Sequence, residues 1–202
     1  MDVPYFNDEG DPIVTWSRPY DFHNDIRYPA MIVKIIDRHF SEIIANPTYK
    51  DTNFGLISND NGFLTYTPNH FSQRTLTARF QVNSTDNKAP LWTHLVPKSA
   101  LTAMGFLSKL YDSKLNFEDF GQFNASEVGV ILTTESNQPY KNFAGVLYNS
   151  ADDDMDESKI VKVTLDISKI TNRMKEPVGI ISILDNEFGN PYKTWKELGS
   201  PR

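Results

Sequence analysis

The sequence predicts an α/β first half followed by an antiparallel β second half, with the division between residues 112 and 127. In the first half, short apolar runs that end in polar clusters alternate with stretches whose apolar residues recur every three or four positions. Strands that alternate with helices produce this pattern. After residue 124, strand-like runs follow one another with only polar turns between them. We therefore expect two domains, residues 1–115 and residues 116–202.

Two helices are predicted in the first half, at residues 25–46 and 99–111. The apolar residues of the longer helix share one face, because they recur at steps of three and four: Ile26, Ala30, Val33, Ile36, Phe40 and Ile43. Asn24 or Asp25 can cap its start, and Pro47 cannot continue the helix.

Polar clusters follow two short apolar strands of the first half at their C-terminal ends. The strand at 3–6 runs into the cluster 7–12, and the strand at 54–58 runs into the cluster 59–62. In a barrel of parallel strands, catalytic groups lie at this end of each strand. A third run, residues 76–82, alternates like a strand with one face in water.

Four strand-like runs make up the second half: residues 128–133, 143–148, 160–167 and 178–184. Between the second and third of these lies an acidic run, residues 152–157. We interpret this run as a solvated hairpin loop, because it lacks the glycine and the terminal glutamate of a calcium-binding EF-hand loop.

Composition argues against several classes of protein. The net charge of −6 and the lack of a basic stripe argue against nucleic-acid binding. No apolar run is long enough for a membrane span, and the first residues lack the pattern of a signal peptide. The absence of cysteine excludes thiolate nucleophiles and cysteine metal sites. Asn83 and Asn124 begin N-glycosylation sequons, which act only if the chain enters the secretory route.

Glu9 is the first candidate for chemistry, because it follows a buried strand. A retaining glycosidase needs such a carboxylate to attack the anomeric carbon and a second carboxyl group about 5 Å away. Asp60 could accept hydrogen bonds from sugar hydroxyls, and the planar guanidinium of Arg74 suits a carboxylate or a sulfate. From the residues alone, ordinary capping carboxylates and a surface salt bridge remain the simpler interpretations.

His39 and His70 invite comparison with two-histidine phosphoesterases. Their spacing of 31 positions is short for that arrangement, and His39 lies within the predicted helix, on or beside its apolar face. A partly buried structural histidine is the better interpretation of His39.

The chain resembles glycoside hydrolase family 39 over nearly its whole length. Residues 2–17, DVPYFNDEGDPIVTWS, resemble the nucleophile segment of this family. The similarity extends through further segments in the same order: residues 30–36, 56–64, 73–83, 101–105, 184–186, 190–195 and 199–201. The resemblance implies that the first half contains the last two βα units of a TIM barrel and that the second half is part of an antiparallel β-sandwich.

The resemblance also implies the roles of particular residues. Glu9 matches the nucleophile after the seventh barrel strand, and Asp60 matches a substrate-binding aspartate after the eighth. Arg74 matches the arginine that faces the carboxylate of a uronic acid. The backbone amides of Thr15 and Trp16 match contacts to the same carboxylate, although the family more often has glycine at the position of Thr15. Thr15 is compatible with that contact unless the backbone requires a positive φ.

A retaining hydrolase is therefore expected, one that removes terminal non-reducing α-L-iduronic acid from dermatan and heparan sulfate. The resemblance implies a lysosomal glycoprotein that arrives by the secretory route, with Asn83 and Asn124 glycosylated. No metal, organic cofactor, nucleic acid or membrane is expected as a partner. A homodimer of the full-length protein remains open.

One catalytic group of the family is absent from the sequence. The acid/base glutamate of the family follows its fourth barrel strand, upstream of these residues, so the 202 residues alone are expected to be inactive. Two alternatives remain. A xylosidase-like member of the family would not need Arg74 or the backbone contacts at Thr15 and Trp16. A non-catalytic carbohydrate-binding or scaffold protein would not need Glu9.

Overall fold

A computed structural model describes most of the chain between residues 4 and 201. The described residues are 4–7, 20–56, 70–71, 75–82, 92–116, 127–138, 141–151, 162–164, 166, 168, 176 and 178–201. Their elements in chain order are β1 (Tyr5–Asn7), the 3-10 turn η1 (Asp21–His23), α1 (Arg27–His39), the π-helical turn η2 (Phe40–Ile44), the 3-10 turn η3 (Pro47–Tyr49), β2 (Phe54–Leu56), β3 (Thr77–Val82), β4 (Trp92–Pro97), α2 (Ser99–Leu107), β5 (Ser113–Lys114), β6 (Val128–Thr134), β7 (Phe143–Asn149) and α4 (Pro191–Glu197).

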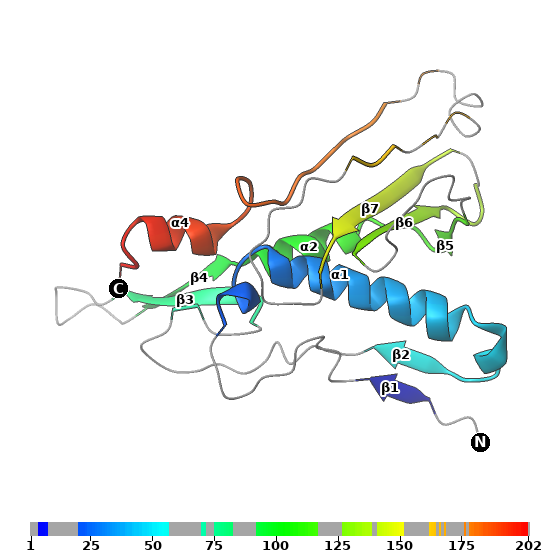
Figure 1. Ribbon diagram of the computed structural model, residues 1–202, viewed down its shortest axis with the longest axis horizontal. Coiled ribbons are helices and arrows are strands. Elements are labelled where there is room, and N and C mark those ends of the chain that lie inside the picture. Colours follow the sequence, from blue (N-terminus) through cyan, green and yellow to red (C-terminus); the bar gives the residue numbers. More distant parts are fainter. Residues whose placement is uncertain are drawn as a thin grey trace.

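The strands β1 and β2 are parallel, and α1 connects them (Figure 1). In their register Tyr5 pairs with Phe54 and Asn7 pairs with Leu56. A parallel pair requires a crossover connection of this kind, because a tight turn reverses the direction of the chain. The predicted order of strand, helix and strand is thereby confirmed. The first strand is not the buried strand that we expected before Glu9, because Tyr5 is 65% exposed and Phe6 is 56% exposed. The C-terminal ends of both strands lie at the same edge of the pair.

The predicted helix is confirmed as α1, but it is shorter than the predicted residues 25–46. Its buried face also differs from the predicted one, because only Val33 of the six predicted apolar positions is buried and Phe40 is exposed. It is α-helical to His39 and then continues as η2. At its start the side chain of Asp25 accepts a hydrogen bond of 2.9 Å from the backbone N–H of Arg27, as expected of a capping carboxylate. Tyr28 and Ile32 on its apolar face are fully buried and pack against Ala100 of α2. The second helix, α2, ends four residues before the predicted position 111.

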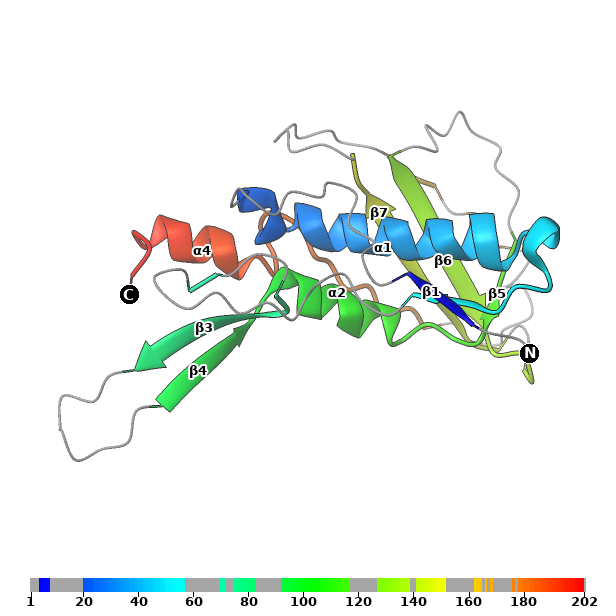
Figure 2. The ribbon, with the colours of Figure 1, turned by 90° about the horizontal axis from the view of Figure 1, so that it is seen from below.

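The strands β3 and β4 form an antiparallel hairpin that projects from the rest of the chain (Figure 2). The strand predicted at residues 76–82 is β3, and β4 was not predicted. Thr93, His94 and Leu95 of β4 are all exposed, so this strand lacks the buried face that an alternating sequence pattern would reveal.

In the second half, β5, β6 and β7 form an antiparallel sheet in that order. The strands predicted at 128–133 and 143–148 are confirmed as β6 and β7. The short strand β5 was not predicted, and it pairs with β6 although it lies before residue 115. The division of the chain into domains at residues 115 and 116 remains a prediction.

The prediction of a strand at 178–184 is wrong within the described part of the chain. There these residues pair with no described strand, and most of their apolar side chains face solvent: Val178 is 90% exposed and Ile180 is 92% exposed, whereas Leu184 packs against the core. A strand needs a neighbouring strand to satisfy its backbone hydrogen bonds. Of the run predicted at 160–167, residues 162–164 and 166 are described and form no strand. The acidic run at 152–157 lies outside the described residues.

The helices of the first half and the sheet of the second half share one apolar core. Val33 of α1, Ala103 of α2, Ile131 of β6 and Tyr148 of β7 are buried together. Figure 1 shows α1 between this sheet and the β1–β2 pair. The contact between α1 and β2 is made by His39, whose ring stacks on that of Phe54 with centroids 5.7 Å apart.

A glycine in β6 makes room for the ring of Tyr148. Gly129 is paired with Tyr148 across the sheet, and a Cβ atom at Gly129 would overlap the phenol of that tyrosine. The phenol donates a hydrogen bond of 2.9 Å to Asp37 of α1. Gly129 therefore permits the contact that joins the sheet to the helix.

We predict that Gly129→Ala lowers the free energy of unfolding by about 1–3 kcal/mol, because the added methyl group displaces Tyr148 from a packed core. Gly105→Ala in α2 is the matched control. An added Cβ there meets no atom within 4 Å, so this variant should gain about 0.5–1 kcal/mol from the lower backbone entropy of the unfolded chain. Denaturant unfolding of both variants tests the difference. Equal effects would contradict the role of Gly129.

Candidate functional site

All the residues predicted for catalysis, substrate binding and glycosylation lie outside the described residues: Glu9, Thr15, Trp16, Asp60, Arg74, Asn83 and Asn124. Their roles remain predictions. The described residues are the elements that precede and follow the segments containing these predicted residues.

The C-terminal ends of β1 and β2 are the points of departure. Asn7 and Leu56 are paired, and Glu9 and Asp60 follow these positions by two and four residues in the chain. Both segments therefore begin at one edge of a parallel pair, where α/β folds carry their catalytic groups.

This edge faces the N-terminal end of α1. The helix runs antiparallel to both strands, because it connects two parallel strands, and the contact of His39 with Phe54 fixes its C-terminal end beside the start of β2. The N-terminal end of α1 and the preceding turn η1 consequently lie toward the strand ends that lead to Glu9 and Asp60 (Figure 1).

A buried lysine connects the segments at this end of the helix. Lys98 precedes α2 and is 1% exposed. Its Nζ atom lies 2.7 Å from Oδ1 of Asn24, 3.4 Å from the backbone oxygen of His23 and 3.4 Å from Oγ1 of Thr75. A protonated lysine has three donors, and these three oxygens can accept from them. Burial lowers the pKa of Lys98 to about 7.

Lys98 also holds its surroundings through the backbone. Its N–H donates to the carbonyl of Leu76 at 2.9 Å, immediately before β3. The hydroxyl of the next residue, Ser99, donates to the carbonyl of Gly189 at 2.8 Å. Lys98 therefore lies where the turn η1, the start of β3, the start of α2 and the chain before α4 meet.

An aromatic cluster lies beside the start of β3. His70 stacks on Phe80 with ring centroids 4.5 Å apart. The ring centroid of Phe71 lies 5.1 Å from that of Tyr192 and 5.1 Å from that of Trp195, both in α4. The helix α4 was not predicted. Its start has a readable pattern, because Asn190 caps the helix by accepting from the N–H of Lys193 and Pro191 occupies the first helical position.

Tyr192 joins this cluster to the turn η1. Its hydroxyl donates a hydrogen bond of 2.5 Å to Oδ1 of Asp21. Burial raises the pKa of Tyr192, and the hydrogen bond to Asp21 and the charge of that carboxylate raise it further, so the phenol remains a donor at physiological pH. This contact links residues 171 positions apart, which no local pattern in the sequence could indicate.

The two histidines that suggested a phosphoesterase have structural contacts. His39 is half-buried, and its Nδ1 lies 2.8 Å from the carbonyl of Ile35 in the preceding turn of the helix. Nδ1 of His70 lies 3.0 Å from the carbonyl of Arg79. Among the described residues, no group of three or more histidine, aspartate or glutamate side chains is arranged to hold a metal ion. No described helix is both long enough and apolar enough to cross a membrane.

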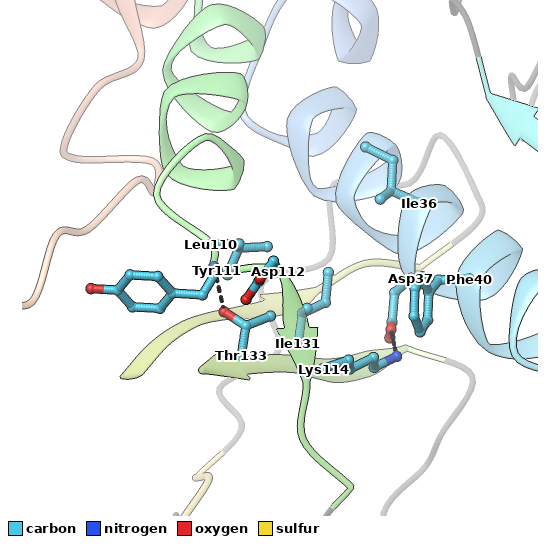
Figure 3. A pocket seen from close by; sticks show the side chains of 9 residues that line it. All are labelled: Ile36, Asp37, Phe40, Leu110, Tyr111, Asp112, Lys114, Ile131 and Thr133. Carbon is cyan, nitrogen blue, oxygen red and sulfur yellow. Dashed lines mark hydrogen bonds and ion pairs between the residues drawn. The ribbon is translucent and has the colours of Figure 1, made fainter. Parts of the chain in front are cut away.

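A cavity of about 180 Å³ lies between α1 and the antiparallel sheet (Figure 3). Ion pairing and hydrogen bonding already engage several of its polar groups. Asp37 binds Lys114 at 2.7 Å, and Oγ1 of Thr133 accepts from the backbone N–H of Tyr111 at 2.8 Å. The cavity lies at the C-terminal end of α1, whereas the strand ends of β1 and β2 face its N-terminal end. We therefore regard it as a packing feature of the core.

Comparison with known proteins gives consistent matches. The family model of glycosyl hydrolases family 39 matches residues 1–202. The α-L-iduronidase of Homo sapiens is 38% identical over 212 residues, which cover 99% of this chain and 31% of that protein. The α-L-iduronidase of Mus musculus is 36% identical over 208 residues, which cover 99% of this chain and 32% of that protein. The chain thus spans about a third of the length of these relatives.

A solved structure is also similar. It is the bacterial orthologue of human α-L-iduronidase, described as catalytically competent without N-glycan modifications. It superposes with a TM-score of 0.59 and 28% sequence identity over 75% of this chain and 24% of that chain.

We predict a pH-dependent effect of replacing Lys98 by methionine. Between about pH 7 and pH 10.5 the unfolded chain binds a proton at Lys98 that the folded chain does not hold. As the pH increases through this range, the free energy of unfolding of the unsubstituted protein should therefore rise relative to that of Lys98→Met, by up to about 1.4 kcal/mol per pH unit. Below pH 7 both states are protonated and the difference should be constant. Denaturant unfolding of both proteins across this range measures it, and a difference that does not change with pH would contradict the lowered pKa.

Proposed function

We propose, from the premise that this chain belongs to the glycosyl hydrolases of family 39, that it is part of a retaining α-L-iduronidase. The substrate class is terminal non-reducing α-L-iduronic acid on dermatan and heparan sulfate. The observation that carries the proposal is the pairing of Asn7 with Leu56 at the C-terminal edge of β1 and β2. The segments with the proposed nucleophile and the proposed sugar-binding aspartate leave from this edge.

In the proposed mechanism Glu9 attacks the anomeric carbon and forms a covalent glycosyl-enzyme. A second carboxyl group protonates the leaving oxygen and then activates the water that releases the sugar. The resemblance assigns this acid/base glutamate to an earlier strand of the family's barrel. The activity is therefore proposed for the full-length protein and not for these 202 residues alone.

Substrate recognition is proposed to depend on local positive charge. The guanidinium of Arg74 would bind the uronate carboxylate with two parallel hydrogen bonds, and the backbone amides of Thr15 and Trp16 would donate to the same group. Asp60 would accept from sugar hydroxyls. These short-range contacts outweigh the modest repulsion between a polyanionic substrate and a chain of net charge −6. The mechanism needs no metal or organic cofactor.

A lysosomal location is proposed, reached by the secretory route. An acidic lumen keeps the acid/base carboxyl protonated, while hydrogen bonds keep the nucleophile ionised. Asn83 and Asn124 are the proposed glycosylation positions. Because the bacterial orthologue is described as competent without N-glycans, we assign these glycans no part in the chemistry.

We predict that a 5-fluoro iduronosyl fluoride labels Glu9 covalently in the full-length protein. The fluorine destabilises the oxocarbenium-like transition state of both steps, and the good leaving group keeps the first step fast enough for the ester to accumulate. Peptide mapping by mass spectrometry identifies the labelled residue.

Asp8 and Asp11 are the internal controls for this experiment, because they flank Glu9 and share its chemistry. Glu9→Gln should abolish the label. A label on Asp8 or Asp11, or an active protein that takes no label, would refute the assignment of Glu9.

We predict that Arg74→Lys lowers kcat/KM for an aryl α-L-iduronide by about 10–100-fold, because lysine keeps the charge but loses the two-pronged donor geometry. Hydrolysis of the corresponding idoside, which has a hydroxymethyl group in place of the carboxylate, is the control and should change little. Unchanged kcat/KM for the iduronide would remove Arg74 from the carboxylate site and favour the xylosidase-like alternative.

A further inference from the structure

Lys98 contacts the described chain shortly after each of the two proposed carboxylate-binding segments. Thr15 and Trp16 belong to residues 8–19, and the chain that follows them contributes His23 and Asn24 to Lys98. Arg74 directly precedes Thr75, whose hydroxyl accepts from the same ammonium. Asn24 and Thr75, which are 74 and 23 positions from Lys98 in the sequence, therefore meet at one buried cation.

We propose that Lys98 is a positioning residue that fixes the turn η1 and the start of β3 relative to each other. These are the described parts of the chain that follow the two proposed carboxylate-binding segments, and Lys98 would thereby contribute to the selectivity of the site for uronic acids. The inference rests on the proposed function. It adds to that function a residue that acts through its neighbours without touching the substrate.

The contacts of Thr75 make this position sensitive to Lys98. Thr75 is 2% exposed, and its hydroxyl donates to the carbonyl of Thr77 at 2.9 Å while it accepts from Lys98. The backbone N–H of Lys98 binds the carbonyl of Leu76. The first turn of chain after Arg74 is thus held by both the side chain and the backbone of one residue.

The contacts of Asn24 act in the same way on the other segment. Its side chain is buried and presents Oδ1 to Lys98 at 2.7 Å, the shortest of the three contacts. Removal of the ammonium would leave this oxygen without its closest donor, and the unmet hydrogen bond favours a shift of the turn η1. A displacement of about 1 Å in a substrate-positioning group can lower a rate by about 100-fold.

Lys34 offers a matched comparison within the same fold. It is also buried, at 7% exposure, and its Nζ donates to the carbonyl of Ser150 at 3.1 Å. This contact joins α1 to the end of β7 and involves none of the segments that lead to the proposed site. Lys34 is therefore a buried lysine whose described contact lies away from η1 and from the start of β3.

The test compares Lys98→Met with Lys34→Met in the full-length protein, using an aryl α-L-iduronide and the corresponding uncharged idoside. For Lys98→Met we expect the ratio of the two kcat/KM values, iduronide over idoside, to fall by about 10–100-fold, largely through a higher KM for the iduronide. For Lys34→Met we expect the ratio to be unchanged, whatever the loss of stability.

Thr75→Val and Thr75→Ser keep the test decisive if Lys98→Met does not fold. Valine has the shape of threonine without the acceptor for Lys98, so it should lower the ratio, whereas serine keeps the hydroxyl and should restore it. If the unsubstituted enzyme is active and the folded Lys98→Met or Thr75→Val protein has the same ratio, the positioning role of Lys98 is overturned but the proposed function is not. If the unchanged protein hydrolyses neither glycoside, the proposed function itself is overturned.

Discussion

The burial of α1 is the constraint on which the rest of the described structure depends. The helix connects the parallel strands β1 and β2, packs its fully buried Tyr28 and Ile32 against α2, and contributes Val33 to the core shared with β6 and β7. Near its C-terminal end, Asp37 binds both Lys114 of β5 and Tyr148 of β7. Asp37 is half-buried, so these partners offset the cost of removing its carboxylate partly from water.

The two ends of α1 consequently have different functions. At the C-terminal end, Asp37 joins the helix to the antiparallel sheet, beside the cavity that lies between them. At the N-terminal end it faces the strand ends that lead to Glu9 and Asp60, and there Lys98 gathers the turn η1 and the start of β3. The contacts of Asp37 with the antiparallel sheet and the contacts beside the proposed site therefore lie at opposite ends of one helix.

The parts of the fold predicted from sequence are those with a strong local pattern. The apolar residues of α1 recur at steps of three and four, which predicts a helix, and β6 and β7 are short apolar runs between polar turns, which predict strands. The hairpin strand β4 has exposed residues at its centre and lacks that pattern. The apolar run at 178–184 predicts a strand, but an apolar run becomes a strand only when a neighbouring strand satisfies its backbone hydrogen bonds.

The sequence by itself determined which residues are candidates for chemistry. The motif around Glu9, the aspartate after β2 and the arginine before β3 are local patterns, and their resemblance to a glycosidase family needs no coordinates. Only the tertiary structure decided that Lys98, Asn24 and Thr75 meet, and that Tyr192 reaches Asp21. Such contacts join residues from 23 to 171 positions apart. Their geometry depends on how whole elements pack, which no short stretch of sequence contains.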